Sequence, residues 1–200
     1  AICYDNYFQS YARAAYRELL AGRDPQPSLK RALVNVAITR KLSSQFIDAE
    51  QYAALAHLIQ ARDLVAHKQD PAPALTQLRA DLAACFVIAA QDVVCRTLAA
   101  QAELVAADWQ TSLTQPSAAS LNAALTKAQL ATQSPERYPD AWQTLAETYH
   151  VLTRRKAWKP RGHDYNSGAI WKYAQVVSSA EKGAVTHPGG KAETHVYADI

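Results

Sequence analysis

The sequence has no methionine, only six glycines and no long runs of β-branched residues. Few glycines and few β-branched runs argue against a fold built from strands and tight turns, whereas the abundant alanine favours closely packed helices. Because the chain is 200 residues long, it can bury a substantial core without disulfides or metals. We therefore expect an all-α fold. The lack of methionine and the start at Ala1 predict a processed chain or a piece of a longer polypeptide.

Long apolar segments are also missing. No stretch approaches the run of about 18 apolar residues that a membrane-spanning helix needs, and no basic region followed by an apolar run begins the chain. We therefore expect a cytoplasmic protein that does not bind membranes. The 21 Lys and Arg residues against 18 Asp and Glu give a net charge of +3, spread along the chain. So weak a field argues against nucleic acid as a partner.

The cysteines are few and unpaired in the sequence. There are three, Cys3, Cys85 and Cys95, with no CxxC pair among them. An odd number without that spacing indicates neither a disulfide framework nor a zinc site. Cys85 also lies in an apolar stretch between Leu82 and Val87. The sequence therefore predicts free, buried thiols in a reducing cytosol, and no metal.

Motifs that carry catalysis are absent as well. The six histidines form no HExxH motif, and Gly189-Gly190 has no preceding strand that would make it a phosphate-binding loop. Carboxylates are scattered as in any helical protein, which gives no specific signal for acid–base chemistry. The sequence predicts no catalytic residue and no cofactor.

What the chain does contain is an internal repeat. The turn segment 23–29 reappears as 69–75, and Asp24 matches Asp70 at a spacing of 46 residues. One further step leads to segment 115–121, which keeps a proline but loses the Asp-Pro pair. A period of this length is typical of stacked helical units.

Small residues follow the same period. Ala54, Ala100 and Ala146 are 46 residues apart, and Phe8 occupies that position in the first unit. A small side chain allows a neighbouring helix to approach closely, so we expect these positions at helix contacts. The exception at Phe8 is typical of an irregular terminal repeat.

The periodicity predicts eight helices arranged as four hairpins, with a tail after them. The expected helices cover residues 3–21, 28–42, 48–68, 72–90, 92–112, 117–131, 138–157 and 165–181. Residues 1–181 would form one helical repeat domain, and 182–200, which have no apolar period, an extended C-terminal tail.

The fourth unit resembles the tetratricopeptide repeat (TPR). That family's pattern of Trp, Leu, small residue and aromatic matches Trp142, Leu145, Ala146 and Tyr149. Together with the Asp-Pro turns and the Ser134-Pro135-Glu136 linker, the array over residues 5–180 is similar to the degenerate repeats that follow the kinase domain of large bacterial serine/threonine kinases. The resemblance implies a TPR-like α-solenoid, a right-handed stack of antiparallel hairpins, and a regulatory or docking role without phosphoryl transfer.

In such arrays the first helix of each hairpin lines a concave face, where ligands bind. Stepping the pattern from Trp142 by 46 residues selects a polar, amide-rich stripe, for which solvated helix surface is the alternative interpretation. The positions are Asp5, Gln9, Asp48, Gln51, Thr97, Gln101, Asp140, Gln143, Glu147 and His150. Amides pair with both donors and acceptors of an extended backbone. The first hypothesis is therefore a non-catalytic scaffold that binds a protein or peptide, as a module of a larger polypeptide or assembly.

A second hypothesis remains open beside it. The four tryptophans and the histidines would converge on one closed pocket, and the chain would be an all-helical enzyme or a carrier of a small ligand or cofactor. Packing between helices is the competing role for those tryptophans. Nucleic-acid binding, a third hypothesis, would require the basic residues to share one face.

Overall fold

The structure is a computed structural model, and it describes residues 2–134 and 138–154. These residues form seven helices and no strand, in agreement with the expected all-α class. The helices are α1 (Ile2–Leu20), α2 (Gln26–Leu42), α3 (Ile47–Ala66), α4 (Ala72–Ile88), α5 (Val93–Ser112), α6 (Ala118–Thr132) and α7 (Pro139–Arg154). The helix expected at 165–181 and the tail expected at 182–200 lie outside the described residues.

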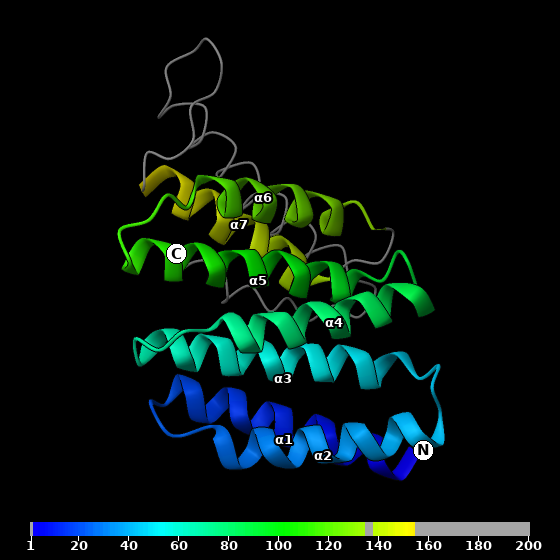
Figure 1. The fold of residues 1–200 in the computed structure, drawn as a ribbon. Coiled ribbons are helices and arrows are strands. Elements are labelled where there is room, and N and C mark those ends of the chain that lie inside the picture. The colour runs from blue at the N-terminus through cyan, green and yellow to red at the C-terminus, as the bar shows by residue number, and fades with distance from the viewer. Residues whose placement is uncertain (1, 135–137, 155–200) are drawn as a thin grey trace, which may run out of the picture.

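Helices that follow one another in the chain pack in pairs. α1 packs on α2, α3 on α4 and α5 on α6, and α6 packs on α7. In addition, α1 contacts α3, α3 contacts α5, and α5 contacts α7, so the odd-numbered helices form a continuous series. Figure 1 shows these pairs as successive layers from α1 and α2 at one end to α6 and α7 at the other.

The 46-residue period is present in the backbone at the ends of the odd helices. Gly22, Lys68 and Thr114 follow α1, α3 and α5, and their φ angles are 64°, 57° and 57°. In each case the next residue donates its backbone N–H to a carbonyl in the last turn of the helix, as Arg23 does to Glu18 at 2.8 Å. This is the left-handed residue that commonly ends a helix. The three corners therefore have one geometry, although only the first has glycine.

The start of the next helix is also repeated, but only twice. The carboxylate of Asp24 accepts a hydrogen bond from the backbone N–H of Gln26, and Asp70 does the same for Ala72, both at 2.9 Å. Such a side chain satisfies a backbone donor that a helix start leaves unpaired. The third corner has Pro116 at the position of Asp24 and Asp70 and therefore lacks this carboxylate, as the loss of the Asp-Pro pair in the sequence predicts.

Alanine and a few larger residues fill the contacts between the odd helices. Ala54, Ala100 and Ala146 are completely buried, as is Phe8 at the equivalent place in α1. Ala100 and Ala146 share one apolar cluster with Leu121 and Leu145, in which α5, α6 and α7 meet. The ring of Phe8 lies 5.3 Å from that of Tyr52 on α3, which gives the first unit an aromatic contact where the others have alanine.

A buried ionic cluster holds the α1–α2 and α3–α4 pairs together. Arg40 of α2 donates to Glu50 of α3 at 2.9 Å and to Asp81 of α4 at 2.7 Å, and Asp81 also contacts Nδ1 of His57 at 2.6 Å. Burial opposes the charge on Arg40, but the hydrogen bonds that Arg40 donates to Glu50 and Asp81, together with the negative charges of these carboxylates, outweigh it and raise the pKa of the guanidinium. Each charge of this cluster is therefore paired.

Candidate ligand pocket

A pocket of about 1000 Å³ lies along the odd-numbered helices. Its walls come from α1, α3, α5 and α7, together with Tyr138 just before α7. Apolar side chains such as Leu55, Leu58 and Ile59 form part of the lining, and polar side chains form the rest. A pocket of this size, with a few convergent polar groups, suits a small molecule.

Three arginines give the pocket its positive charge. Arg13 and Arg17 lie one helical turn apart on α1, and Arg62 lies near the end of α3. Among the residues that the structure describes, Arg13 and Arg17 form no salt bridge. Guanidinium groups bind carboxylates through two parallel hydrogen bonds. The α1 side of the pocket is therefore suited to an acid.

Amides on the neighbouring helices are held in place by the protein. Nε2 of Gln51 donates to Asp92 at 3.0 Å, and Nε2 of Gln101 donates to the hydroxyl of Thr144 at 3.0 Å. One N–H of each amide is thus engaged, which orients the side chain, and the amide oxygen is an acceptor for a ligand hydroxyl. Thr97 also lines the pocket, but its hydroxyl donates to the carbonyl of Val93 at 2.7 Å.

The α7 side carries two carboxylates and a histidine. Burial raises the pKa of Glu147, with Asp108 adding to the effect, while the positive charges of Arg62 and His150 oppose it. Tyr138 has a raised pKa because of burial, and because of the charge of Asp140 and a hydrogen bond with it. Glu147 therefore takes up a proton more readily than an exposed glutamate does.

Most of the predicted stripe lies in this pocket. Gln51, Thr97, Gln101, Asp140, Gln143, Glu147 and His150 all line it. Gln9 and Asp48 lie on α1 and α3, are partly buried and interact elsewhere, and they are not part of the lining. Asp5 lies in α1, but its side chain is outside the described part.

Sequence reasoning missed the arginines and the tyrosines of the pocket, which include Tyr16 and Tyr52. The predicted stripe covers mainly the first half of each odd helix, and the lining continues along the same face. Extending it by three or four residues leads from Gln51 through Leu55 to Ile59 and Arg62, which is the helical period itself. The helical spacing in the sequence could therefore have identified Arg62 as a residue on the same face as Gln51.

The second hypothesis expected tryptophan and histidine around the pocket. His150 lines it, but among the described residues no tryptophan does. Trp142 packs at the edge of the apolar cluster between α5, α6 and α7, which is the packing role that was its alternative. Trp158 and Trp171 lie outside the described residues.

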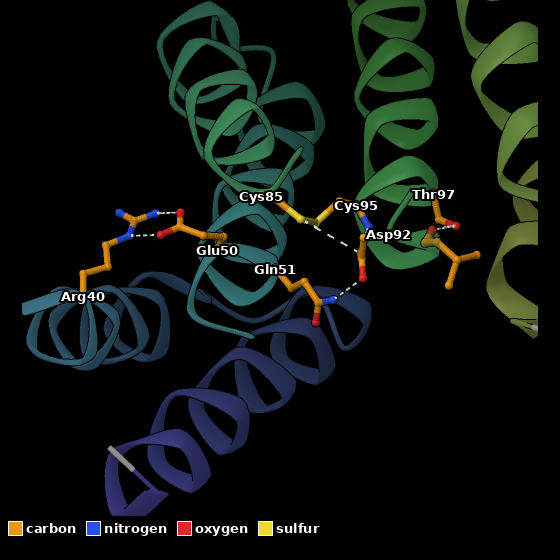
Figure 2. The surroundings of a disulfide bond; sticks show 8 residues. Arg40, Glu50, Gln51, Cys85, Asp92, Cys95 and Thr97 are labelled. Carbon is orange, nitrogen blue, oxygen red and sulfur yellow. Dashed lines mark hydrogen bonds and ion pairs between the residues drawn. A yellow bond between two sulfur atoms is a disulfide. The ribbon is translucent and has the colours of Figure 1, made fainter. Parts of the chain in front are cut away.

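The expectation of free thiols at Cys85 and Cys95 is wrong. The two sulfur atoms form a disulfide that joins the end of α4 to the first turn of α5, with Cα atoms 6.6 Å apart. Figure 2 shows the bond beside Asp92, toward which Gln51 points. No local pattern indicates this pairing, because ten residues separate the cysteines and only the turn between the two helices brings them together.

Comparison with known proteins yields relatives over part of the chain. No family profile matches, and no solved structure matches. The chain is 72% identical over 51 residues to a dihydroxy-acid dehydratase of Parvibaculum lavamentivorans, a stretch that covers 25% of this chain and 9% of that protein. A dihydroxy-acid dehydratase 2 of Mesorhizobium japonicum is 72% identical over 50 residues, or 25% of this chain and 8% of that protein. The dihydroxy-acid dehydratase of Dinoroseobacter shibae is 60% identical over 51 residues, with shares of 25% and 9%.

These relatives correct the family resemblance. The curated relatives are dihydroxy-acid dehydratases and not tetratricopeptide or kinase-repeat proteins. The resemblance rested on small and aromatic residues at helix contacts. Any closely packed helical pair selects such residues, so they report packing and not ancestry.

The predicted function and partner are corrected by the same finding. A non-catalytic scaffold that binds a protein or peptide conflicts with relatives named as enzymes, and the enzyme or small-ligand alternative agrees with them better. As for membranes, none of the helices within 2–134 and 138–154 has the length and apolar character to cross one.

Proposed function

We propose that the chain binds a small hydroxylated carboxylic acid in this pocket and serves an enzyme that removes water from such acids. The observation that carries the proposal is the joint presence of arginines and of amides with engaged donors in one pocket. The names of the relatives point to the same ligand class, because a dihydroxy acid has one carboxylate and two hydroxyls.

The carboxylate is assigned to the arginines. Arg13 and Arg17 have no competing salt bridge among the described residues, so an incoming anion does not have to displace one. Arg62 lies on α3 in the lining of the same pocket, and its charge acts on Glu147. A carboxylate bound by these groups gains charge-assisted hydrogen bonds, which are stronger than those between neutral groups.

The hydroxyls are assigned to the amides and to α7. The oxygen atoms of Gln51 and Gln101 accept from ligand hydroxyls, and Gln143 adds a further donor and acceptor. Glu147, with its raised pKa, holds or releases a proton beside a hydroxyl that is lost as water. Because the shared stretch is only 9% of a dehydratase, we assign ligand binding to this chain and not the complete reaction.

We also propose that the helical layers continue as a right-handed stack of hairpins, an α-solenoid in which residues 165–181 add the eighth helix and 182–200 form the tail. The repeated corners at Gly22, Lys68 and Thr114 support this arrangement. A cytoplasmic location is part of the same proposal, because hydroxy acids are consumed there as metabolites.

Calorimetric titration of the full chain tests the proposal. A 2,3-dihydroxycarboxylic acid is compared with its uncharged amide and with the acid that lacks both hydroxyls. We expect only the dihydroxy acid to bind well. Arg17→Gln and Arg62→Gln should each weaken binding by about 10–100-fold, the usual cost of a lost charged hydrogen bond.

Arg23→Gln is the matched control, because Arg23 is an exposed arginine outside the pocket. It should leave the affinity unchanged. Equal binding of acid and amide, or an equal loss in Arg23→Gln, would remove the basis of the proposal.

A further inference from the structure

A second site lies where α4 meets α5. Ligand atoms of Cys85, Cys95 and Asp92 are all within 4.8 Å of one another. Both sulfur atoms are completely buried, and Asp92 is partly buried. The group brings two soft donors and one hard donor to a single point, and soft sulfur is what zinc prefers among divalent ions.

The surroundings fix the three groups in position. Asp92 is the N-cap of α5, and its Oδ1 accepts from the backbone N–H of Cys95 at 2.7 Å. Its Oδ2 accepts from Nε2 of Gln51 at 3.0 Å, and Sγ of Cys85 lies 4.0 Å from Oδ1. The carboxylate is therefore oriented by two donors, as the supported ligands of metal sites are.

The electrostatics of the site depend on the state of the sulfur atoms. In the disulfide they are neutral, and Asp92 is the single charge of the group. Once the bond is reduced, the two sulfur atoms are neutral thiols beside the carboxylate, because burial and the negative charge of Asp92 both disfavour thiolates, and only a bound cation would make two thiolates favourable here. The N-terminus of α5 favours negative charge on Cys95 but does not balance three charges.

We infer that the reduced chain binds one Zn²⁺ through Cys85, Cys95 and Asp92. A dithiol reductant opens the disulfide by exchange: the protein takes up two electrons and two protons and becomes two thiols, while the reductant becomes a disulfide. Zinc then binds both sulfur atoms as thiolates and releases the two thiol protons, and the carboxylate supplies the third bond.

The distances suit this change. Zinc–sulfur bonds are about 2.3 Å and zinc–oxygen bonds about 2.0–2.2 Å, so the donors of a tetrahedral site lie about 3.5–3.8 Å apart. The carboxylate and sulfur donors need to shift by about an ångström from the 4.8 Å within which they lie, and the two sulfur atoms must move apart from their bonded positions. Three protein ligands leave a fourth position for water, the pattern of open zinc sites.

The two sites are separate in their chemistry, so zinc binding does not rest on the proposed function. Gln51 is the one residue they share, since it supports Asp92 and lines the pocket. A chain that binds no hydroxy acid can still bind zinc, and the reverse also holds.

Zinc binding is measured on the full chain with Cys3→Ser as the background, which removes the third thiol. The protein is reduced with dithiothreitol, desalted without oxygen and titrated with Zn²⁺. Co²⁺ reports the ligands through its thiolate charge-transfer and tetrahedral d–d bands. We expect one ion per reduced chain and none in the oxidised chain. Binding of zinc to both states alike, or to neither, would overturn the proposal.

Variants identify the ligands. Cys85→Ser and Cys95→Ser should each lower the affinity by about 100-fold. Asp92→Asn keeps an acceptor for the helix cap but removes the charge, and it should lower the affinity by at least about tenfold. The exposed Asp70, whose carboxylate accepts a hydrogen bond from the backbone N–H of Ala72 at the start of α4, gives the control Asp70→Asn with no effect. An unchanged affinity in Asp92→Asn would exclude it as a ligand.

A measurement without ligand variants covers the case in which these fail to fold. In the Cys3→Ser protein, iodoacetamide alkylates Cys85 and Cys95 after reduction, and mass spectrometry follows both. Zinc should slow the alkylation of both cysteines together and restore any helix signal lost on reduction. Alkylation at the same rate with and without zinc would contradict the site.

Discussion

Two neighbouring residues of α3 connect it to opposite sides by different chemistry. Glu50 faces Arg40 of α2 in an ionic joint that also includes Asp81 and His57, whereas Gln51 faces Asp92 beside the disulfide that joins α4 to α5. Figure 2 shows the two contacts on the two sides of α3. We call the first group the ionic joint, and the disulfide between Cys85 and Cys95 the covalent joint.

The difference teaches how each joint stabilises the fold. The ionic joint depends on every partner, because removing one leaves a buried charge without compensation. The covalent joint acts mainly on the unfolded chain, whose freedom the cross-link reduces. The ionic joint should therefore be sensitive to substitution, and the covalent joint to the redox state.

The largest expected effect is that of Asp81→Ala. The side chain of Asp81 is only 7% exposed and pairs with both Arg40 and His57, so its loss removes this partner from His57 and leaves Arg40 with Glu50 alone. Because the side chain of Arg40 is 37% exposed, water partly compensates for the loss. We expect a decrease of about 2–4 kcal/mol in the free energy of unfolding, measured with urea. A decrease below about 1 kcal/mol would mean that the ionic joint contributes little.

Opening the covalent joint should cost slightly less. The ten-residue separation of Cys85 and Cys95 closes a short loop, for which chain entropy predicts about 2–3 kcal/mol. The comparison is the Cys85→Ser/Cys95→Ser protein against the oxidised chain, with a chelator present to exclude metal. Added reductant should lower the stability of the oxidised chain and leave the double variant unchanged. Equal responses would show that the disulfide is not the sensitive element.

The helix-ending residues Gly22 and Lys68 should respond to substitution with opposite signs, each by up to about 1 kcal/mol in the free energy of unfolding. Gly22 has a φ of 64° and open space where a Cβ would lie, so Gly22→Ala should destabilise the chain by about 1 kcal/mol through the backbone alone. Lys68 has the same conformation without being glycine, and Lys68→Gly should stabilise it by about 0.5–1 kcal/mol. Thermal unfolding of both variants measures whether each substitution lowers or raises the stability. The same sign for both would contradict the equivalence of the corners.

The smallest effect is the pH dependence of stability that comes from Glu147 of α7, a residue that belongs to neither joint. Because burial raises the pKa of Glu147 above 4.5, the folded chain holds its proton more tightly than the unfolded chain. Stability must then fall as the pH rises from about 4.5 through the raised pKa. The Glu147→Gln variant has no carboxyl group to ionise at this position. The difference between its free energy of unfolding and that of the original chain should therefore grow across that pH interval. Urea unfolding at a series of pH values measures this difference. A difference that shrinks as the pH rises would contradict a raised pKa of Glu147 in the folded chain.

The helices were predictable because their signals are local. The expected ranges 48–68 and 92–112, for example, differ from α3 and α5 by at most two residues at each end. Proline turns and apolar periods lie within a few residues of the boundaries they set. The step of 46 residues relates Gln51, Thr97 and Gln143 to one another, and all three line the pocket.

Features that depend on two distant segments were not predictable. Arg40 pairs with Asp81 across 41 residues, and the disulfide requires the α4–α5 turn to bring its cysteines together. The arginines of the pocket come from α1 and α3, and composition shows only a weak positive charge spread along the chain. The enzyme relatives were not recognised because the helix pattern pointed to a fold common to many functions.

The completely buried alanines between the odd helices have a consequence for the pocket. Ala100 and Ala146 hold α5 and α7 as near to each other as a methyl group permits. An added side chain such as that of valine at Ala100 would wedge α7 outward and carry Gln143 and Glu147 with it. The width of the pocket is thus set by buried residues behind its lining. Substitutions at these positions, which no ligand contacts, would change the size of the acids that the pocket accepts.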